Sequence, residues 1–200
     1  MKVIPLTSRR SKYSCNAYIV LGDARRAEHA NGLVDVGADD DIVRRIDEAY
    51  SGVREKPVER VVLTHARPEY KGPLAAVIGA YKPDVCGAVA GDGIATVIAD
   101  GETLKIGNRD FEVIATRVHG QDSILLYCED EGVLFSGDVP LNITRPGGTY
   151  EPSYVSALEI VAERAINTIY PGFGDAITDK AEIMIRTTLL FVRQSGIAVV

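Results

Sequence analysis

Short apolar segments rich in valine, isoleucine and leucine recur along the whole chain, and turn residues separate them. Runs of this length and composition are typical of strands. Two pairs of runs are joined by short turns and predict hairpins. The expected strands are residues 14–21, 33–37, 58–64, 84–89, 103–106, 110–116, 123–128, 133–136 and 168–170.

Segments with helical periodicity lie between these strands. In residues 39–50, acidic residues come first and apolar residues recur on one face, which predicts an amphipathic helix. Strands that alternate with helices predict one α/β domain over residues 1–200, with two sheets covered by helices on their outer faces, an αββα sandwich. Further helices are expected at 73–81, 91–99 and 153–165, and from a cap at Thr178 to about 194.

Charge and composition limit the classes of partner. The chain has 22 Lys and Arg against 28 Asp and Glu, a net charge of −6, and no run of Lys and Arg is longer than Arg9-Arg10. Phosphate backbones need concentrated basic charge, so nucleic acid is not an expected partner. Because no apolar run approaches the ~20 residues of a membrane span, a membrane is not expected either. A small-molecule ligand of unknown identity is the expected partner, and a homodimer stays open.

The cysteines and the N-terminus bear on the compartment. Cys15, Cys86 and Cys128 are widely spaced, form no C-x-x-C pattern and lie in apolar runs, as expected of buried thiols in a reducing compartment. The N-terminus reaches Arg9 before a long apolar stretch develops, which argues against a secretory signal. We therefore expect a cytoplasmic protein.

Isolated polar residues follow several of the predicted strands. His65 follows residues 61–64, His119 follows residues 111–117, and Asp138 follows residues 133–137. One such residue alone is typical of a loop or a cap. Three of them favour a convergent site, because open sheets often bind ligands beyond the ends of their strands.

Six segments in the same order resemble the motifs of the metallo-β-lactamase superfamily, and they span nearly the whole chain. Residues 64–72 read T-H-A-R-P-E-Y-K-G where the family carries T-H-x-H-x-D-H-x-G, and residues 119–124 read H-G-Q-D-S-I, where it has a histidine before a strand. Residues 134–138 read L-F-S-G-D, the segment of the family's bridging aspartate. Residues 171–175 read P-G-F-G-D, with phenylalanine in place of the family's last histidine. The remaining matches are the early aspartate strand at 33–37 and the start of the last helix at 178–182.

The resemblance implies a site with few of the family's metal ligands. In hydrolytic members, five histidines and two aspartates hold two metal ions that acidify a water and polarise the substrate. Arginine has only donors and cannot ligate, phenylalanine has no donor atom, and tyrosine is a poor ligand at neutral pH. A dinuclear zinc hydrolase is therefore not expected. The seven positions hold His65, Arg67, Glu69, Tyr70, His119, Asp138 and Phe173.

One interpretation is metal-free. Arg67 then supplies a fixed positive charge between Glu69 and Asp138, in place of the metals. The protein would be a pseudoenzyme or a binder of a small anionic ligand, held by Arg67, His65 and His119, with no cofactor. Tyr70 and Tyr150 are further candidates for ligand contact.

Two alternatives stay open. In the first, His65, His119 and Asp138, with Glu69 as a candidate fourth ligand, hold one zinc or iron ion. The chain would then be a metal-dependent hydrolase or an oxidoreductase, with His65, Asp138 and Glu69 as candidate catalytic residues. In the second alternative, the chain is a regulatory or structural interaction subunit.

Overall fold

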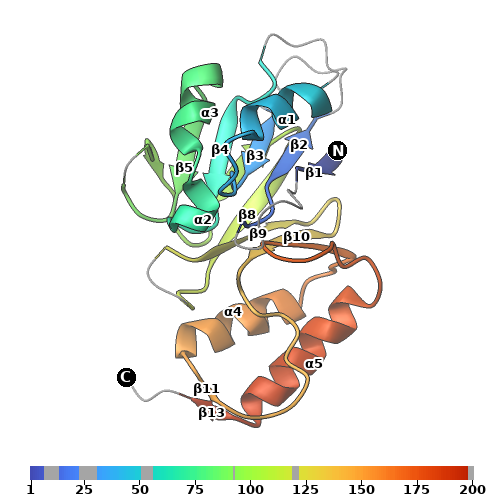
Figure 1. Cartoon of the computed structure of the whole chain (residues 1–200). Coiled ribbons are helices and arrows are strands. Elements are labelled where there is room, and N and C mark those ends of the chain that lie inside the picture. The colour runs from blue at the N-terminus through green and yellow to red at the C-terminus, as the bar shows by residue number, and fades with distance from the viewer. Residues whose placement is uncertain (7–13, 23–30, 51–55, 92, 119–121, 198–200) are drawn as a thin grey trace.

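The computed structural model describes residues 1–6, 14–22, 31–50, 56–91, 93–118 and 122–197. These residues form four layers in which helices cover the outer faces of two packed β-sheets (Figure 1). This is the αββα sandwich predicted from the alternation of strands and helices.

The first sheet is built from the N-terminal half of the chain and has the strand order β1-β2-β3-β4-β5-β6. Antiparallel pairing joins β1 to β2 and β2 to β3, and parallel pairing joins β3 through β6. Parallel neighbours end at the same edge, so β3 and β4 deliver the residues that follow them to one place. The strands are β1 Lys2–Pro5, β2 Tyr18–Leu21, β3 Gly32–Val34, β4 Arg60–Leu63, β5 Asp84–Gly87 and β6 Thr96–Val97.

Helices α1 Ile42–Ala49, α2 Pro68–Lys71 and α3 Leu74–Tyr81 lie along this half, and α1 and α3 cover the outer face of the sheet (Figure 1). Ile46 of α1 and Val77 of α3 are fully buried in one hydrophobic cluster with strand residues. Burial of their apolar surface fixes the outer layer on the sheet.

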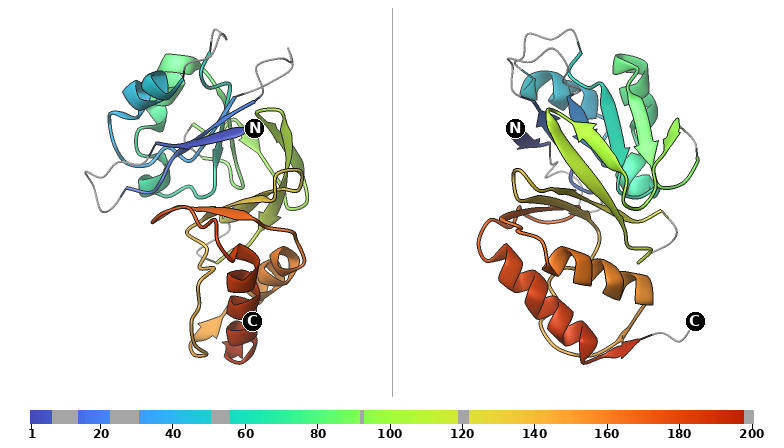
Figure 2. Two further views of the ribbon diagram at one scale, coloured as in Figure 1. Left: turned by 90° about the vertical axis from the view of Figure 1, so that its right-hand side faces the viewer. Right: turned by 180° about the vertical axis from the view of Figure 1, so that it is seen from behind.

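The second sheet has the strand order β12-β10-β9-β8-β7 and contains both predicted hairpins. Helices α4 Pro152–Ala162 and α5 Ala181–Arg193 cover its outer face. Strands β11 Thr149–Tyr150 and β13 Gly196–Ile197 pair at the end of α5 that is remote from the sheets (Figure 2). The strands of the sheet are β7 Thr103–Ile106, β8 Arg109–Ala115, β9 Ile124–Cys128, β10 Val133–Gly137 and β12 Thr168–Pro171.

Aromatic side chains join the two sheets. Phe135 contacts Tyr18 of the first sheet with ring centroids 5.5 Å apart and stacks on Tyr170 at 5.2 Å. These rings belong to an inter-sheet cluster that also holds Cys86 and Cys128. These two cysteines and Cys15 are buried, as their apolar surroundings predicted.

Two local expectations are wrong, and one strand was not expected. Residues 94–98 do not form the predicted helix: Thr96–Val97 is strand β6, and the backbone amides of Ala95 and Ile98 bond to β5 carbonyls. The apolar spacing fits either structure, and the free edge of β5 decides between them. The last helix starts at Ala181, with Lys180 rather than Thr178 as its cap. The segment Lys2–Pro5, which was not predicted to be a strand, extends the sheet as β1.

Within the described part of the chain, no helix is long and apolar enough to cross a membrane.

Candidate functional site

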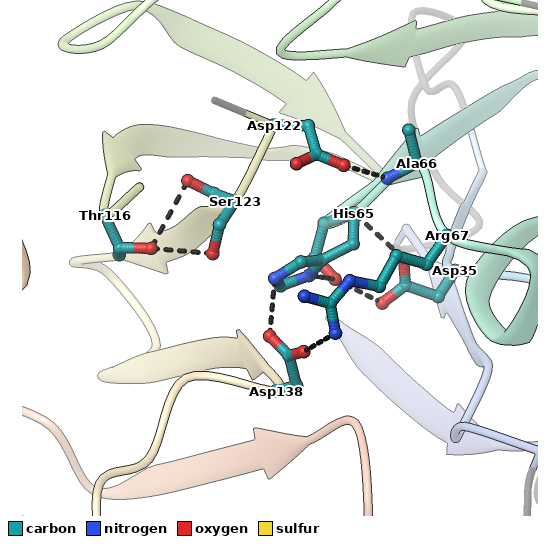
Figure 3. Close-up of polar contacts among 9 residues, drawn as sticks. Asp35, His65, Ala66, Arg67, Thr116, Asp122, Ser123 and Asp138 are labelled. Carbon is teal, nitrogen blue, oxygen red and sulfur yellow. Dashed lines mark hydrogen bonds and ion pairs between the residues drawn. The ribbon is translucent and has the colours of Figure 1, made fainter. Parts of the chain in front are cut away.

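Residues that follow β3, β4 and β10 meet where these strands end (Figure 3). Asp35 follows β3, His65 and Arg67 follow β4, and Asp138 follows β10. The structure therefore brings together His65 and Asp138, two of the three residues predicted to converge, and places Arg67 beside them. The first sheet supplies the two basic side chains, and the second supplies the carboxylate between them.

A buried chain of polar contacts fixes the His65 ring from behind. The backbone amide and the hydroxyl of Thr64 each donate to a different oxygen of Asp35, both at 2.8 Å. The Thr64 hydroxyl oxygen also lies 3.2 Å from His65 Nδ1. When the hydroxyl proton is donated to Asp35, that oxygen is left to accept a proton from Nδ1. The contacts thus orient Nε2 of His65 toward Asp138.

Burial dominates the electrostatics of Asp35. Its side chain is almost fully buried, and its backbone has a positive φ of 57°. Loss of water raises the pKa of this carboxyl to about 7, although the two bonds from Thr64 and the nearby His65 oppose the shift. Asp35 therefore changes charge near neutral pH.

Asp138 lies between the imidazole of His65 and the guanidinium of Arg67. Its Oδ1 is 2.5 Å from His65 Nε2, although the two groups lack the alignment of a hydrogen bond. Its Oδ2 is 3.4 Å from Arg67 Nη1, a long contact. The His65 side chain is fully buried, that of Asp138 is 13% exposed, and that of Arg67 is 39% exposed. The charge of Arg67 therefore reaches solvent, whereas Asp138 is largely shielded from it.

Gly137 allows β10 to approach β4 closely. Its φ is +52°, and a Cβ there would lie 2.6 Å from Thr64 Oγ1 and 3.1 Å from the His65 ring. Any side chain would push Asp138 away from His65. The glycine before the aspartate is thus a geometric condition for the contact between the sheets.

Two aromatic residues occupy positions at which the family resemblance places histidines. Tyr70 is fully buried, and its ring centroid lies 4.9 Å from that of His65. Phe173 meets Tyr70 edge-on at 6.0 Å and is 47% exposed. Gly172 makes room for this contact, because a Cβ there would lie 2.5 Å from the Tyr70 hydroxyl. Together the two rings form an aromatic wall beside His65.

Other residues of the predicted site are placed differently. His119 lies outside the described residues, and so does the side chain of Glu69, whose backbone is in α2. Tyr150 is on β11, and its ring packs against that of Tyr154 with centroids 5.6 Å apart. The structure does not bring Tyr150 to His65 and Asp138, because helices α4 and α5 lie between β11 and the sheets (Figures 1 and 2).

Two polar residues that sequence reasoning did not single out also hold the site. Asp122 accepts a 2.7 Å bond from the amide of Ala66, which ties the segment after β4 to the segment before β9. Buried Asn16 donates from Nδ2 to the carbonyl oxygens of Pro171 and Gly174, at 2.9 and 2.8 Å. Asn16 thereby fixes the loop that carries Phe173. Each contact spans more than 50 residues of sequence, so no local pattern could have revealed it.

The described donor atoms do not fit a metal site. Among the residues that the structure describes, no three His, Cys, Asp or Glu side chains are grouped so that they could hold an ion. His65 and Asp138 offer two donors, and the guanidinium of Arg67 stands beside them where the family resemblance places another histidine. A protonated arginine repels a cation and has no lone pair to offer it.

A cavity of about 320 Å³ opens beside Asp138. Its walls come from the end of β10, the segment that follows it, β12 and the loop after it, and α5. Most of the side chains around it are apolar, and the exceptions include two aspartates. The lining residues are Ser136, Gly137, Asp138, Val139, Pro140, Leu141, Asn142, Ile169, Pro171, Phe173, Gly174, Asp175, Ile177 and Met184.

Comparison with known proteins agrees with this geometry. The sequence model of the metallo-beta-lactamase superfamily matches residues 68–172, more than half of the chain. The chain belongs to this superfamily. Among solved structures, a metallo-beta-lactamase family protein from Thermus thermophilus superposes with a TM-score of 0.69 at 15% identity, over 96% of this chain and 79% of that one. The rubredoxin oxygen:oxidoreductase from Desulfovibrio gigas superposes with a TM-score of 0.66 at 19% identity, over 92% of this chain and 55% of that one.

Curated relatives are longer than this chain. Thioesterase pkgB of Emericella nidulans is 26% identical over 129 residues, which are 64% of this superfamily member and 38% of the thioesterase. The match thus spans less than half the length of that relative. The likeness establishes the family and leaves the activity to be inferred from the site.

Proposed function

We propose that this metallo-beta-lactamase-fold protein works without a dinuclear metal centre and binds a small anionic ligand at Arg67. The observation that carries the proposal is the contact of 3.4 Å between Arg67 Nη1 and Asp138 Oδ2. It sets a fixed positive charge beside the carboxylate that would bridge the metals in hydrolytic relatives. A pseudoenzyme with a ligand-binding site accounts for this arrangement.

Electrostatics supports the exchange of metal for arginine. A shielded carboxylate with no cation nearby costs several kcal/mol, and a guanidinium lowers that cost without a bound ion. Asp138 is shielded, and the Arg67 guanidinium is the positive charge beside it. Because Arg67 is also partly exposed, the same guanidinium is accessible to a ligand.

In the proposed binding site, each residue has a separate role. Arg67 binds the anion with its fixed charge, and Asp138 orients the guanidinium. The contacts from Asp35 through Thr64 hold the His65 ring in place against Asp138. The aromatic wall of Tyr70 and Phe173 borders the site on the side of the cavity.

Metal analysis and anion titration test the proposal together. Protein purified without chelator is expected to contain no stoichiometric zinc or iron, and to be stabilised against heat by inorganic phosphate or acetate. Arg67→Gln should remove the anion effect. Arg164→Gln is the matched control, because Arg164 is 38% exposed and also pairs with one carboxylate, Glu112, away from the site. An equal loss in both variants, or no anion effect in the unmodified protein, would refute the proposal.

A mononuclear metal site is the second candidate. It is favoured by one observation: a histidine nitrogen and a carboxylate oxygen, His65 Nε2 and Asp138 Oδ1, lie together at the ends of β4 and β10, and both are metal-donor atoms. His119, and Glu69 as a candidate fourth ligand, would complete the set. One equivalent of zinc or iron that is lost in His119→Ala would establish this alternative and exclude the metal-free account.

A further inference from the structure

We propose that the cavity beside Asp138 binds the apolar body of an amphipathic monocarboxylate whose carboxylate group lies at Arg67. This inference rests on the proposed function and specifies its ligand class. Asp138 makes the connection, because it contacts Arg67 at 3.4 Å and also lines the cavity. A ligand at the guanidinium therefore has the cavity directly beside it.

The walls of the cavity favour an apolar guest. Phe173, Met184, Ile177 and Leu141 line it, and Phe173 exposes 47% of its surface. An aromatic side chain exposed to this extent is unfavourable in water, and a ligand's apolar surface would cover it. In the family pattern this position carries a histidine, so the change from ligand donor to aromatic ring alters what the cavity can accept.

The cavity is formed before a ligand arrives. Asn16 is almost fully buried, and its side chain holds the carbonyls of Pro171 and Gly174 on both sides of Phe173. The backbone amide of Asn16 also donates to the carbonyl of Gly172 at 2.6 Å. Because these bonds fix the loop, little conformational entropy would be lost when a ligand packs on Phe173.

Size and charge narrow the ligand further. A volume of about 320 Å³ lies at the lower end of the range of roughly 300 to 1,000 Å³ for small-molecule sites, so one ring or a short acyl chain fits. Two carboxylates, Asp138 and Asp175, line the cavity. They would repel a second negative charge on the buried part of the ligand, which disfavours dicarboxylates.

Four probes separate the contribution of the ligand's charge from that of its apolar body. They are phenylacetate, acetate, neutral 2-phenylethanol and 4-carboxyphenylacetate. Binding is followed by NMR titration of the full chain. Phenylacetate should bind at least about tenfold more tightly than acetate or 2-phenylethanol, because only this probe uses both the charge and the cavity. The dicarboxylate should bind more weakly than phenylacetate.

Variants test whether the cavity causes the tighter binding of phenylacetate. Phe173→Ala should weaken phenylacetate binding about tenfold and acetate binding much less, with Phe173→Leu intermediate. Ile183→Ala is the control, because Ile183 is 62% exposed on α5 and does not line the cavity. Melting curves verify that each variant folds.

The outcomes distinguish this inference from the proposed function. If phenylacetate binds no more tightly than acetate, and both depend on Arg67, the cavity inference is wrong and anion binding stands. If Phe173→Ala and Phe173→Leu leave the preference for phenylacetate intact, the cavity inference is also wrong. If acetate and phenylacetate both fail to bind, the proposed function is wrong, and this inference with it.

Discussion

The buried carboxyl of Asp35 should make the stability of the protein fall as the pH rises from about 4 to about 7. Its pKa is raised from 3.8 to about 7 in the folded chain, because burial disfavours the charged form. Between these values the folded state holds a proton that the unfolded state has lost. The stabilisation is therefore complete below the unfolded pKa and is lost by the time the pH passes the folded pKa.

The magnitude follows from the two pKa values. At about 1.4 kcal/mol per pH unit, the difference between 3.8 and about 7 amounts to about 4 kcal/mol. Asp35 is 2% exposed, so solvent screening reduces this figure little. Folded domains are stable by only about 5 to 15 kcal/mol, so the effect is a large fraction of the total.

Urea unfolding at a series of pH values measures the effect directly. Asp35→Asn is the informative variant, since the amide oxygen can accept from the Thr64 backbone and the amide nitrogen can donate to its hydroxyl. It should flatten the pH profile between about pH 4 and pH 7. Asp110→Asn, at an exposed carboxylate, should leave the profile unchanged. A profile that rises over this range, or that is the same in Asp35→Asn, would refute the reasoning.

Three further changes test the packing of the site by thermal or urea unfolding. Arg67→His in metal-free buffer should destabilise the fold by about 1 kcal/mol, because Asp138 loses its fixed cation while solvent screens the partly exposed pair; an unchanged melting temperature would count against charge compensation. Gly137→Ala should cost about 2 kcal/mol or more, because its φ is +52° and Thr64 blocks a Cβ. Gly79→Ala, at a helical position with nothing within 4 Å, should instead stabilise the chain by about 0.5–1 kcal/mol. Equal effects of the two substitutions on stability would be inconsistent with both arguments. Asn16→Ala should cost about 2 kcal/mol, since the partly buried carbonyls of Pro171 and Gly174 each lose the bond from the Asn16 side chain; a stability equal to that of the unmodified chain would show that the loop does not depend on Asn16.

Most strands of the two sheets could be predicted because each carries its own signal. The hairpins β7–β8 and β9–β10 have apolar runs on both sides of a short turn, so local information is sufficient for them. Residues 91–99 have no such local signal. Apolar residues there fit a helix or a strand, and their structure depends on β5, which lies earlier in the chain and offers an open edge.

The candidate site, like the fold, could be predicted only in part. The polar residues after β4 and β10 were expected to converge because strand ends meet at sheet edges, and His65 and Asp138 do so. The supporting contacts of Asp35 and Asn16 were not predicted. They depend on which strands are neighbours and in what register, and the sequence carries that information only through the completed fold.

Arg67, Tyr70 and Phe173 should act as a set, because each change makes sense only with the others. Tyr70 fills the space beside His65 with a buried ring, and Phe173 packs edge-on against Tyr70. Histidine at position 67 alone would therefore face an aromatic wall instead of a second ligand. We expect Arg67→His alone to bind no stoichiometric zinc, and the combination of Arg67→His, Tyr70→His and Phe173→His to bind it measurably, as followed by equilibrium dialysis with elemental analysis. Stoichiometric zinc in the single variant would contradict this dependence, because it would mean that the charge of Arg67 alone keeps the ion out.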